Sequence, residues 1–340
     1  MRSTLTVIIP IYNDSANLAL CYRALSASTR LPDLVIVADD GSSEPLPAPP
    51  DGLRVRVTRL EPGPQGSYVA RNRAVDEALA AGRPANHLLV FVDADVAVHP
   101  DALERIERFM EENPSVTAVF GSYDDAPGDG HWVSRYKNLL HHWVHQHGAG
   151  EAGTFWTGLG TIRCEALQSA GGFDTSADTL RDIELGMRLR RAGLQIRLAP
   201  EIQGTHLKRW TFMRMLRSDI LDRAVPWTRM IVRARNLSTD LNLARESRAA
   251  AVLAWAAAGL LLAALWHPAA LAGALATLAG VAALNRRLYA FMYRRGGALF
   301  GLGAAALHLL YLLYGSATFV LVAAHTLWRD RRRIRSGAAL

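Results

Sequence analysis

The chain has 340 residues and a formal net charge of +7, a balance that by itself is compatible with a nucleic-acid-binding protein. The charge is uneven: residues 1–205 carry 19 Lys and Arg against 26 Asp and Glu, residues 206–248 carry 10 against 4, and residues 249–340 carry 9 against 1. Because the basic excess lies in the region that also holds long apolar runs, it indicates a membrane surface and argues against nucleic acid as a partner.

The beginning of the chain alternates between strand-like and helix-like segments. Residues 1–6 lead directly into a short apolar run followed by polar residues, so no signal peptide is expected. The two cysteines, Cys21 and Cys164, are too widely separated for a metal knuckle or a disulfide framework, which favours a reducing cytoplasmic setting. The alternation predicts an α/β fold with a doubly wound parallel sheet, in which ligands bind beyond the carboxyl ends of the strands. Apolar runs predict buried strands at residues 5–11, 34–38, 53–60 and 87–92.

Acidic side chains follow two of these strands. Asp93 and Asp95 come directly after residues 87–92. Two carboxylates at this spacing can reach one divalent cation and leave open positions for diphosphate oxygens. Asp39 and Asp40 follow the second strand, where they can accept hydrogen bonds from a nucleotide base or ribose. The sequence Asp-Gly-Ser is also typical of a turn, and the two interpretations are compatible.

Three predicted helices carry further candidate residues. Arg71 lies on a helix at about 67–81, where a guanidinium can reach a phosphate. A helix at about 131–146 holds His141, His142, His145 and His147; the spacing of His141 and His145 allows zinc, but no cysteine or carboxylate pair completes such a site, so an acceptor-side or interface helix near lipid headgroups is favoured. A helix at 180–192 carries Asp182 and Glu184.

The order of these segments closely resembles that of the family 2 inverting glycosyltransferases of the GT-A fold. The resemblance covers roughly residues 4–210 and is specific because six motifs occur in the family's order, although each motif alone is ambiguous. The motifs are Val7-Ile8-Ile9-Pro10-Ile11-Tyr12-Asn13, Asp39-Asp40-Gly41-Ser42, Ala70-Arg71-Asn72, Asp93-Ala94-Asp95, Gly171-Gly172-Phe173-Asp174, and Asp182-Ile183-Glu184-Leu185 with Arg188-Leu189.

This resemblance implies a Rossmann-like nucleotide-diphospho-sugar transferase domain at residues 1–205. Asp93 and Asp95 would bind Mg²⁺ or Mn²⁺ bridging the donor diphosphate. Asp182 would be the general base that deprotonates an acceptor hydroxyl for attack at the anomeric carbon, with Glu184 as a supporting carboxylate on the acceptor side. The other residues assigned to the nucleotide-sugar donor are Pro10, Tyr12, Asp39, Asp40 and Arg71.

The sequence departs from the family pattern at two places. Arg181 stands where an acidic residue usually precedes the base, which leaves the details of acceptor handling open. The processive members carry Gln-x-x-Arg-Trp, whereas this chain has His206-Leu207-Lys208-Arg209-Trp210. His206 is a candidate third metal ligand, with a purely structural histidine as the alternative. Arg209 or Lys208 would hold the diphosphate, and Trp210 would stack on an acceptor sugar or lipid.

The remainder of the chain is predicted to be membrane-associated. Residues 206–248 mix apolar and basic residues at helical spacing, which favours an amphipathic linker in the membrane interface over an ordinary surface helix. Residues 249–284 and 296–328 contain no Asp, Glu, Lys or Arg, and each run exceeds the roughly 20 residues that a membrane span needs. Spans are predicted at 249–266, 269–284 and 299–327, within a transmembrane region at 249–328 that a basic tail at 329–340 follows. The last run is ambiguous. As one tilted span it would place the basic tail outside, against the positive-inside tendency, and as two spans it would be too short, so a partly re-entrant or interfacial arrangement around Gly315 is the third possibility, although three spans are favoured.

These observations predict a multi-pass protein of the cell membrane with its catalytic domain facing the cytoplasm. The expected activity is metal-assisted, inverting transfer of a sugar from a nucleotide sugar to a lipid, lipid-linked glycan or other membrane-presented acceptor, in the synthesis of a cell-envelope polysaccharide or glycolipid. One alternative is a processive polysaccharide synthase, for which the chain has few spans and lacks the glutamine. The other is a non-catalytic nucleotide-sugar-binding scaffold, which retention of Asp93, Asp95 and Asp182 disfavours.

Overall fold

A computed structural model describes residues 2–82, 86–175, 180–234 and 245–335. The chain divides into two compact units, Met1–Arg209 and Trp210–Leu340, and each is described by itself. The first unit extends beyond residue 205 because its last strand runs to His206. Its elements are β1 (Thr4–Ile11), α1 (Ser15–Ser26), β2 (Leu34–Asp39), β3 (Val55–Arg59), α2 (Ser67–Ala80), β4 (His87–Val92), β5 (Val96–Val98), α3 (Ala102–Glu112), β6 (Val116–Tyr123), α4 (Trp132–His147), β7 (Gly150–Glu151), β8 (Leu159–Arg163), α5 (Cys164–Ser169), α6 (Arg181–Arg191) and β9 (Gln195–His206).

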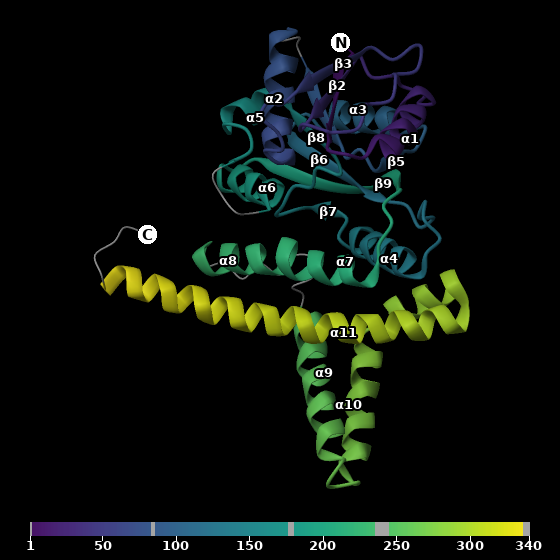
Figure 1. Ribbon diagram of the computed structural model, residues 1–340, viewed down its shortest axis with the longest axis vertical. Helices are drawn as coiled ribbons and strands as arrows, with labels where there is room; N and C mark the ends of the chain where they lie inside the picture. The colour runs from purple at the N-terminus through teal and green to yellow at the C-terminus, as the bar shows by residue number, and fades with distance from the viewer. Residues whose placement is uncertain (1, 83–85, 176–179, 235–244, 336–340) are drawn as a thin grey trace. The chain divides into compact units, whose positions relative to one another are not determined.

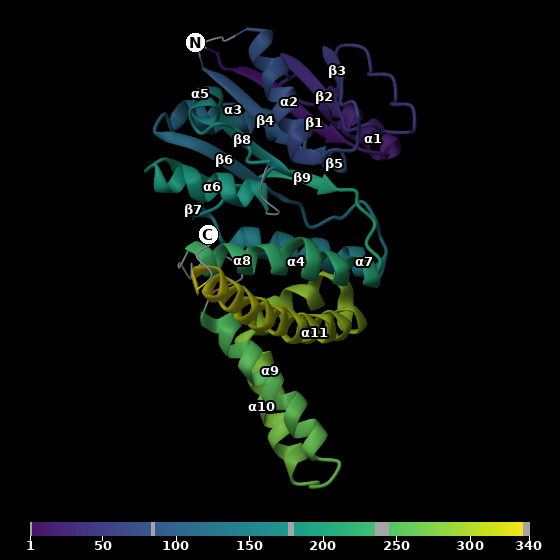
Figure 2. The ribbon, with the colours of Figure 1, turned by 60° about the vertical axis from the view of Figure 1, so that its left-hand side comes forward.

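A mixed sheet with helices on both faces forms the first unit (Figure 1, Figure 2). Within the described residues the strand order is β3-β2-β1-β4-β8-β6-β9-β5, and β7 pairs with β9. The strands β3, β2, β1 and β4 are parallel, as predicted, but β8 runs antiparallel to both β4 and β6. The sheet is therefore not parallel throughout, and the carboxyl ends of β1, β2 and β4 meet at one edge.

Alternating side chains of the strands build two cores. On one face Val7 and Ile9 of β1 pack with Leu18 of α1 and Ile106 of α3. On the other face Ile8, together with residues of β4 and β6, packs against α2, α5 and α6. Because successive side chains of a strand point to opposite faces, a nearly continuous apolar run is what a strand covered by helices on both faces requires.

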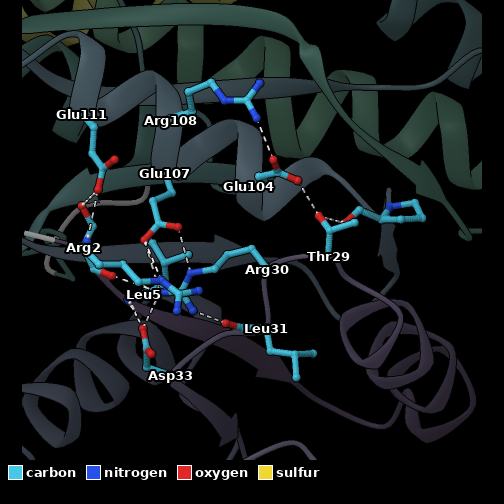
Figure 3. Close-up of polar contacts among 12 residues, drawn as sticks. Arg2, Leu5, Thr29, Arg30, Leu31, Asp33, Glu104, Glu107, Arg108 and Glu111 are labelled. Atoms are coloured by element: carbon cyan, nitrogen blue, oxygen red, sulfur yellow. Dashed lines mark hydrogen bonds and ion pairs between the residues drawn. The ribbon is translucent and has the colours of Figure 1, made fainter.

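A buried arginine fastens the start of the sheet (Figure 3). Arg30 is 5 % exposed and donates to the Ser3 carbonyl at 3.0 Å, to Asp33 at 2.8 Å and to Glu107 of α3 at 2.9 Å. It also donates to the Leu31 carbonyl. Asp33 in turn accepts the backbone N–H of β1 at Leu5, at 2.8 Å. This cluster lies at the amino-terminal edge of the parallel strands, opposite their carboxyl ends.

The second unit is helical. It contains α7 (Phe212–Arg217), the π-helical segment η1 (Ser218–Ala224), α8 (Val225–Ala234), α9 (Arg245–Ala263), α10 (Ala270–Leu284) and α11 (Arg286–Arg335). The helices α9 and α10 form a hairpin (Figure 1). The predicted linker falls on α7, η1 and α8, apart from residues 235–244, which lie outside the described residues, as do residues 336–340 of the predicted tail. The hydroxyl of Tyr314 on α11 donates to Asp219 of η1 at 2.7 Å.

The helix α11 folds back on itself. Tyr289 and His308 are 19 residues apart, a separation of about 28 Å along a straight helix, yet the Tyr289 hydroxyl lies 3.0 Å from His308 Nδ1. The reversal occurs at Gly297, whose φ of 79° and ψ of −177° are not helical. A Cβ on Gly301 would lie 3.1 Å from the Tyr293 backbone, so the two arms pack closely. The predicted span at 299–327 lies within the second, longer arm.

Two helices of the described residues are long and apolar enough to cross a membrane. They are Glu246–Ala263 in α9 and Arg286–Asp330 in α11, and α10 is a shorter apolar helix. The hairpin interior is small and apolar, since Ala250, Ala254 and Val281 are buried together with Leu312.

Candidate active site

The aspartates that follow β4 lie at the carboxyl edge of the sheet. The Asp93 N–H donates to the Gly158 carbonyl at 3.2 Å, and the Asp95 carbonyl accepts the Leu207 N–H at 2.8 Å. The segment is thus held between the residue before β8 and the residue after β9. Both carboxylates are fixed where the sheet ends, which is the position at which α/β proteins bind ligands.

Asp93 forms an ion pair with an arginine that was also predicted to bind the donor. Arg71 of α2 is buried and donates from Nη2 to Asp93 Oδ1 at 2.5 Å. Its Nε has no hydrogen-bond partner among the described residues. Burial raises the pKa of Asp93, the neighbouring carboxylates Asp95 and Asp182 add to this, and Arg71 opposes it. Three carboxylates therefore lie close enough together to repel one another.

Asp95 faces a histidine whose orientation is fixed. His206 Nε2 lies 3.7 Å from Asp95 Oδ2, while His206 Nδ1 donates to Asn138 Oδ1 of α4 at 2.6 Å. Because an amide oxygen can only accept, this bond places a proton on Nδ1 and turns Nε2 toward Asp95. The imidazole stacks on Tyr123 with a centroid distance of 4.2 Å. Burial acts to raise the pKa of Asp95, but His206 and Lys208 outweigh it and the pKa lies below its ordinary value.

Asp182 lies in the first turn of α6 and is buried. Its carboxylate accepts from the Thr157 hydroxyl at 3.4 Å and interacts with the phenol of Tyr68 on α2. Burial, followed by the charge of Asp182, raises the pKa of Tyr68 far above its ordinary value, so this hydroxyl stays protonated. The Tyr68 ring is also covered by the Arg71 guanidinium, 4.9 Å from the ring centre.

Asp39 and Asp40 hold the loops beside the site. Asp39 accepts the Ser42 N–H at 2.8 Å and pairs with Arg59 at 2.7 Å. Asp40 accepts the N–H groups of Gln65 and Gly66, each at 2.7 Å. The turn interpretation of this motif is therefore visible in the structure, while its nucleotide-binding role stays a prediction.

Residues 6–173 match the family described as Glycosyl transferase family 2. The chain carries a glycosyl transferase family 2 domain. It is 28% identical over 210 residues to the uncharacterized protein MT1568 of Mycobacterium tuberculosis, covering 55% of this chain and 62% of that protein, which is less than two thirds of its length. It is 26% identical over 219 residues to the glycosyltransferase AglE of Haloferax volcanii, covering 61% of this chain and 68% of that one.

A solved structure shares the fold. The mannosyltransferase PcManGT from Pyrobaculum calidifontis, determined in complex with GDP-Man and Mn²⁺, superimposes with a TM-score of 0.54 at 20% identity. The match covers 97% of this chain and 88% of the mannosyltransferase. The expectation of a GT-A fold is confirmed.

The remaining predicted residues of the glycosyltransferase domain differ in their partners and in their exposure. Glu184 makes two bonds to Arg188, at 3.0 and 2.9 Å, because residues four apart share one helix face. Pro10 is an internal strand residue paired with Ala38, whereas the Tyr12 ring is half-exposed. Arg209 is exposed at the end of the first unit. Trp210 is buried and begins the second unit, and its predicted stacking on an acceptor stays a prediction.

The histidines of α4 pack against aromatic rings of the first unit. His141 lies 4.5 Å from the Tyr123 ring and 5.0 Å from the Trp156 ring, and His145 Nδ1 lies 3.0 Å from the Gly121 carbonyl oxygen of β6. His141 and His145 are thus turned toward the sheet, whereas His147 is exposed and lies 3.7 Å from the Trp143 ring, so the position of this helix near lipid headgroups stays a prediction. Sequence reasoning missed Tyr68, Thr157 and Asn138, which no local pattern distinguishes.

Proposed function

We propose that this domain transfers a sugar from a nucleotide-diphospho-sugar to an acceptor hydroxyl with inversion. The placement of Asp182 carries the proposal. This carboxylate is close enough to Asp93 to affect it electrostatically, but it has different partners, Thr157 and Tyr68. A base separate from the carboxylates that face the donor suits direct displacement, since the acceptor must attack from the side opposite the leaving group.

The cationic side chains of the site serve the leaving group. Arg71 and Lys208 lie beside Asp93 and Asp95, Arg71 at 2.5 Å from Asp93 and Lys208 Nζ at 3.7 Å from Asp95. A diphosphate entering this edge of the sheet meets both cations, which compensate its charge. Asp182 takes the proton of the acceptor hydroxyl, and the buried Thr157 and the partly buried Tyr68 hold it in place for this step.

The carboxylates fit a divalent cation by their chemistry. Among the described residues no group of three or more His, Cys, Asp or Glu side chains is already arranged around a metal position. However, Asp95 Oδ2 and His206 Nε2 face each other, and a carboxylate oxygen with a neutral imidazole nitrogen is a donor set that suits Mn²⁺. We infer that Asp93, Asp95 and His206 would hold Mn²⁺ or Mg²⁺. When bound, such an ion supplies Lewis-acid neutralisation of the departing diphosphate.

The second unit supports a membrane location and an amphiphilic acceptor. The α9–α10 hairpin is flanked by Arg245 and Arg248 at one end and by Arg286 and Arg287 at the other, whereas His267 and Pro268 form its turn. By the positive-inside tendency both basic ends face the cytoplasm. We propose that the hairpin inserts from that side and that the acceptor is a glycolipid or lipid-linked glycan.

A donor and acceptor screen on the full chain in detergent tests this function. GDP-mannose and UDP-GlcNAc are each offered with Mn²⁺, with octyl glycosides as amphiphilic acceptors and methyl glycosides as soluble ones, and nucleoside diphosphate and glycoside products are measured. We expect transfer to the octyl acceptors and its loss in Asp95→Asn and Asp182→Asn. Undiminished turnover of Asp182→Asn would refute the proposed base, and equal use of methyl glycosides would refute the amphiphilic acceptor. Product size separates a single transfer from a polymer.

A further inference from the structure

Two consecutive residues of α2 join the candidate active site and a separate turn of the same domain. Arg71 bonds to Asp93. Asn72 bonds twice to the backbone of Phe173, accepting its N–H at 2.9 Å and donating to its carbonyl at 2.8 Å. The sequence separation is 101 residues, so these two bonds join α2 to the segment between α5 and α6.

That segment is a turn built for this contact. Gly171 and Gly172 have φ angles of +77° and +74°, in the left-handed region that favours glycine. A Cβ on Gly172 would lie 2.9 Å from Asn72 Oδ1. A larger residue at this position would therefore displace the asparagine amide. The Phe173 ring anchors the turn from the other side by contacts with Tyr68 and Phe91, at centroid distances of 5.5 and 5.3 Å.

The helix that carries Asp182 is hydrogen-bonded to the same turn. Arg188 of α6 donates to the Gly172 carbonyl at 2.8 Å and also to the Ala170 carbonyl. Glu184, one turn earlier on α6, fixes the Arg188 guanidinium by two bonds. The turn is thus bound by Asn72 of α2 on one side and by Arg188 of α6 on the other.

We propose that Asn72, acting through the Gly171-Gly172-Phe173 turn and Arg188, is a positioning residue that fixes Asp182 relative to the donor-facing aspartates. This inference rests on the proposed role of Asp182 as the base. Asp182 needs such positioning contacts for two physical reasons. The buried Asp182 and the partly buried Asp93 are carboxylates that repel each other, and a misplacement of about 1 Å can lower a catalysed rate about 100-fold.

The substitution Asn72→Leu removes both bonds and keeps the side-chain size. We expect kcat for transfer to octyl glycosides to fall about 10- to 100-fold. Because Arg71 is retained, the dissociation constant of the nucleotide sugar should change less than about threefold. The matched control is Asn113→Leu, which also removes an amide bond to a backbone carbonyl, that of Phe109 at 2.8 Å, next to the start of β6 and away from the carboxyl edge. It should retain kcat.

A distance measurement separates positioning from a general loss of stability. Cys21 and Cys164 are both buried, so spin labels attach selectively at Arg73→Cys on α2 and Arg191→Cys on α6, both exposed positions. The distribution of distances between these labels should broaden in Asn72→Leu and stay narrow in Asn113→Leu. If Asn72→Leu does not fold, Arg188→Lys carries the test, because lysine cannot bond to Glu184 and to both carbonyls at once.

Each result has a defined consequence. Unchanged kcat in a folded Asn72→Leu or Arg188→Lys protein overturns the proposal, and so does a kcat loss of the same size in Asn113→Leu. A kcat loss without broadening of the distance distribution also overturns it. Activity of Asp182→Asn, in contrast, refutes the proposed base itself, so the two failures are distinguishable.

Discussion

Replacement of Arg30 by methionine should loosen the amino-terminal edge of the sheet without touching the candidate active site. Methionine keeps an unbranched chain of similar length but has no donor. The change leaves Glu107, which is 13 % exposed, without its main partner. It also leaves the Ser3 carbonyl and the Asp33 carboxylate without the bonds that Arg30 supplies.

The expected loss follows from the burial of each partner. Breaking a buried ion pair by removing one member costs about 3–5 kcal/mol. Here the loss is smaller, because Arg2 remains 3.6 Å from Glu107 and Asp33 is 45 % exposed and regains water. We therefore expect a loss of about 2–3 kcal/mol in the local stability of β1 and α3. Since about 1.4 kcal/mol is a factor of ten, this corresponds to exchange about 30- to 150-fold faster.

Hydrogen–deuterium exchange of the full chain in detergent measures this directly on peptides from β1 and α3. The control Arg105→Met lies on the same helix and removes an exposed pair with Asp101, in which both side chains are 44 % exposed. It should accelerate exchange only about twofold, because exposed pairs contribute about 0.5 kcal/mol or less. Equal effects of the two substitutions would refute the reasoning, as would an Arg30→Met protein with wild-type exchange. The double variant Arg30→Met with Glu107→Leu should recover part of the loss.

Three further predictions follow from single contacts. Asn138→Leu removes the hydrogen bond that orients His206 and fixes a proton on its Nδ1. It should weaken Mn²⁺ binding about 10- to 100-fold in calorimetry and change the ¹⁵N NMR signals of the imidazole. Unaltered binding would contradict the role of this bond. Tyr68→Phe removes the phenol beside Asp182 and should lower kcat about tenfold while the donor dissociation constant stays constant, as the ring over Arg71 remains. Burial opposes ionisation of Asp33, but Arg30 and the Leu5 N–H outweigh it and lower its pKa from 3.8. The modest contribution of the ionised Asp33 to the free energy of unfolding should therefore be complete above about pH 4 and be lost below it. Hydrogen–deuterium exchange at different pH values measures this.

The strands that carry the site were predictable because a strand buried on both faces has a nearly continuous apolar sequence. Residues 87–92 are apolar except for His87 and form β4 with the predicted bounds, and residues 5–11 extend by only one residue in β1. The mixed character of the sheet was not predictable in this way. β9 contains Gln195, Arg197, Glu201 and Gln203, and its pairing with β5 and β6 depends on contacts between distant segments that no local pattern records.

The residues of the candidate active site also fall into those that a local pattern predicts and those that depend on distant contacts. Asp93, Asp95 and Asp182 follow from strand ends and a family motif. Their partners come from segments far away in sequence, since Asn138 meets His206 across 68 residues and Thr157 meets Asp182 across 25. The sequence around Asn138 also contains no pattern that distinguishes a buried amide that orients a histidine from an amide on the surface of a helix. Glu184 is a motif residue two positions after the proposed base, and the motif does not reveal that it bonds to Arg188 of the same helix.

The final apolar run shows why length and hydropathy alone leave membrane topology undetermined. A continuous helix over residues 286–335 would be about 75 Å long, more than twice the roughly 30 Å hydrocarbon core. Two adjacent glycines, Gly296 and Gly297, permit the reversal, and the Tyr289–His308 contact shows that the arms lie side by side. The longer arm still measures about 57 Å, so it cannot cross a bilayer upright within the hydrocarbon alone. Its buried bond from Tyr314 to Asp219 of η1 joins it to the segment predicted for the membrane interface, which favours the interfacial alternative over a third upright span.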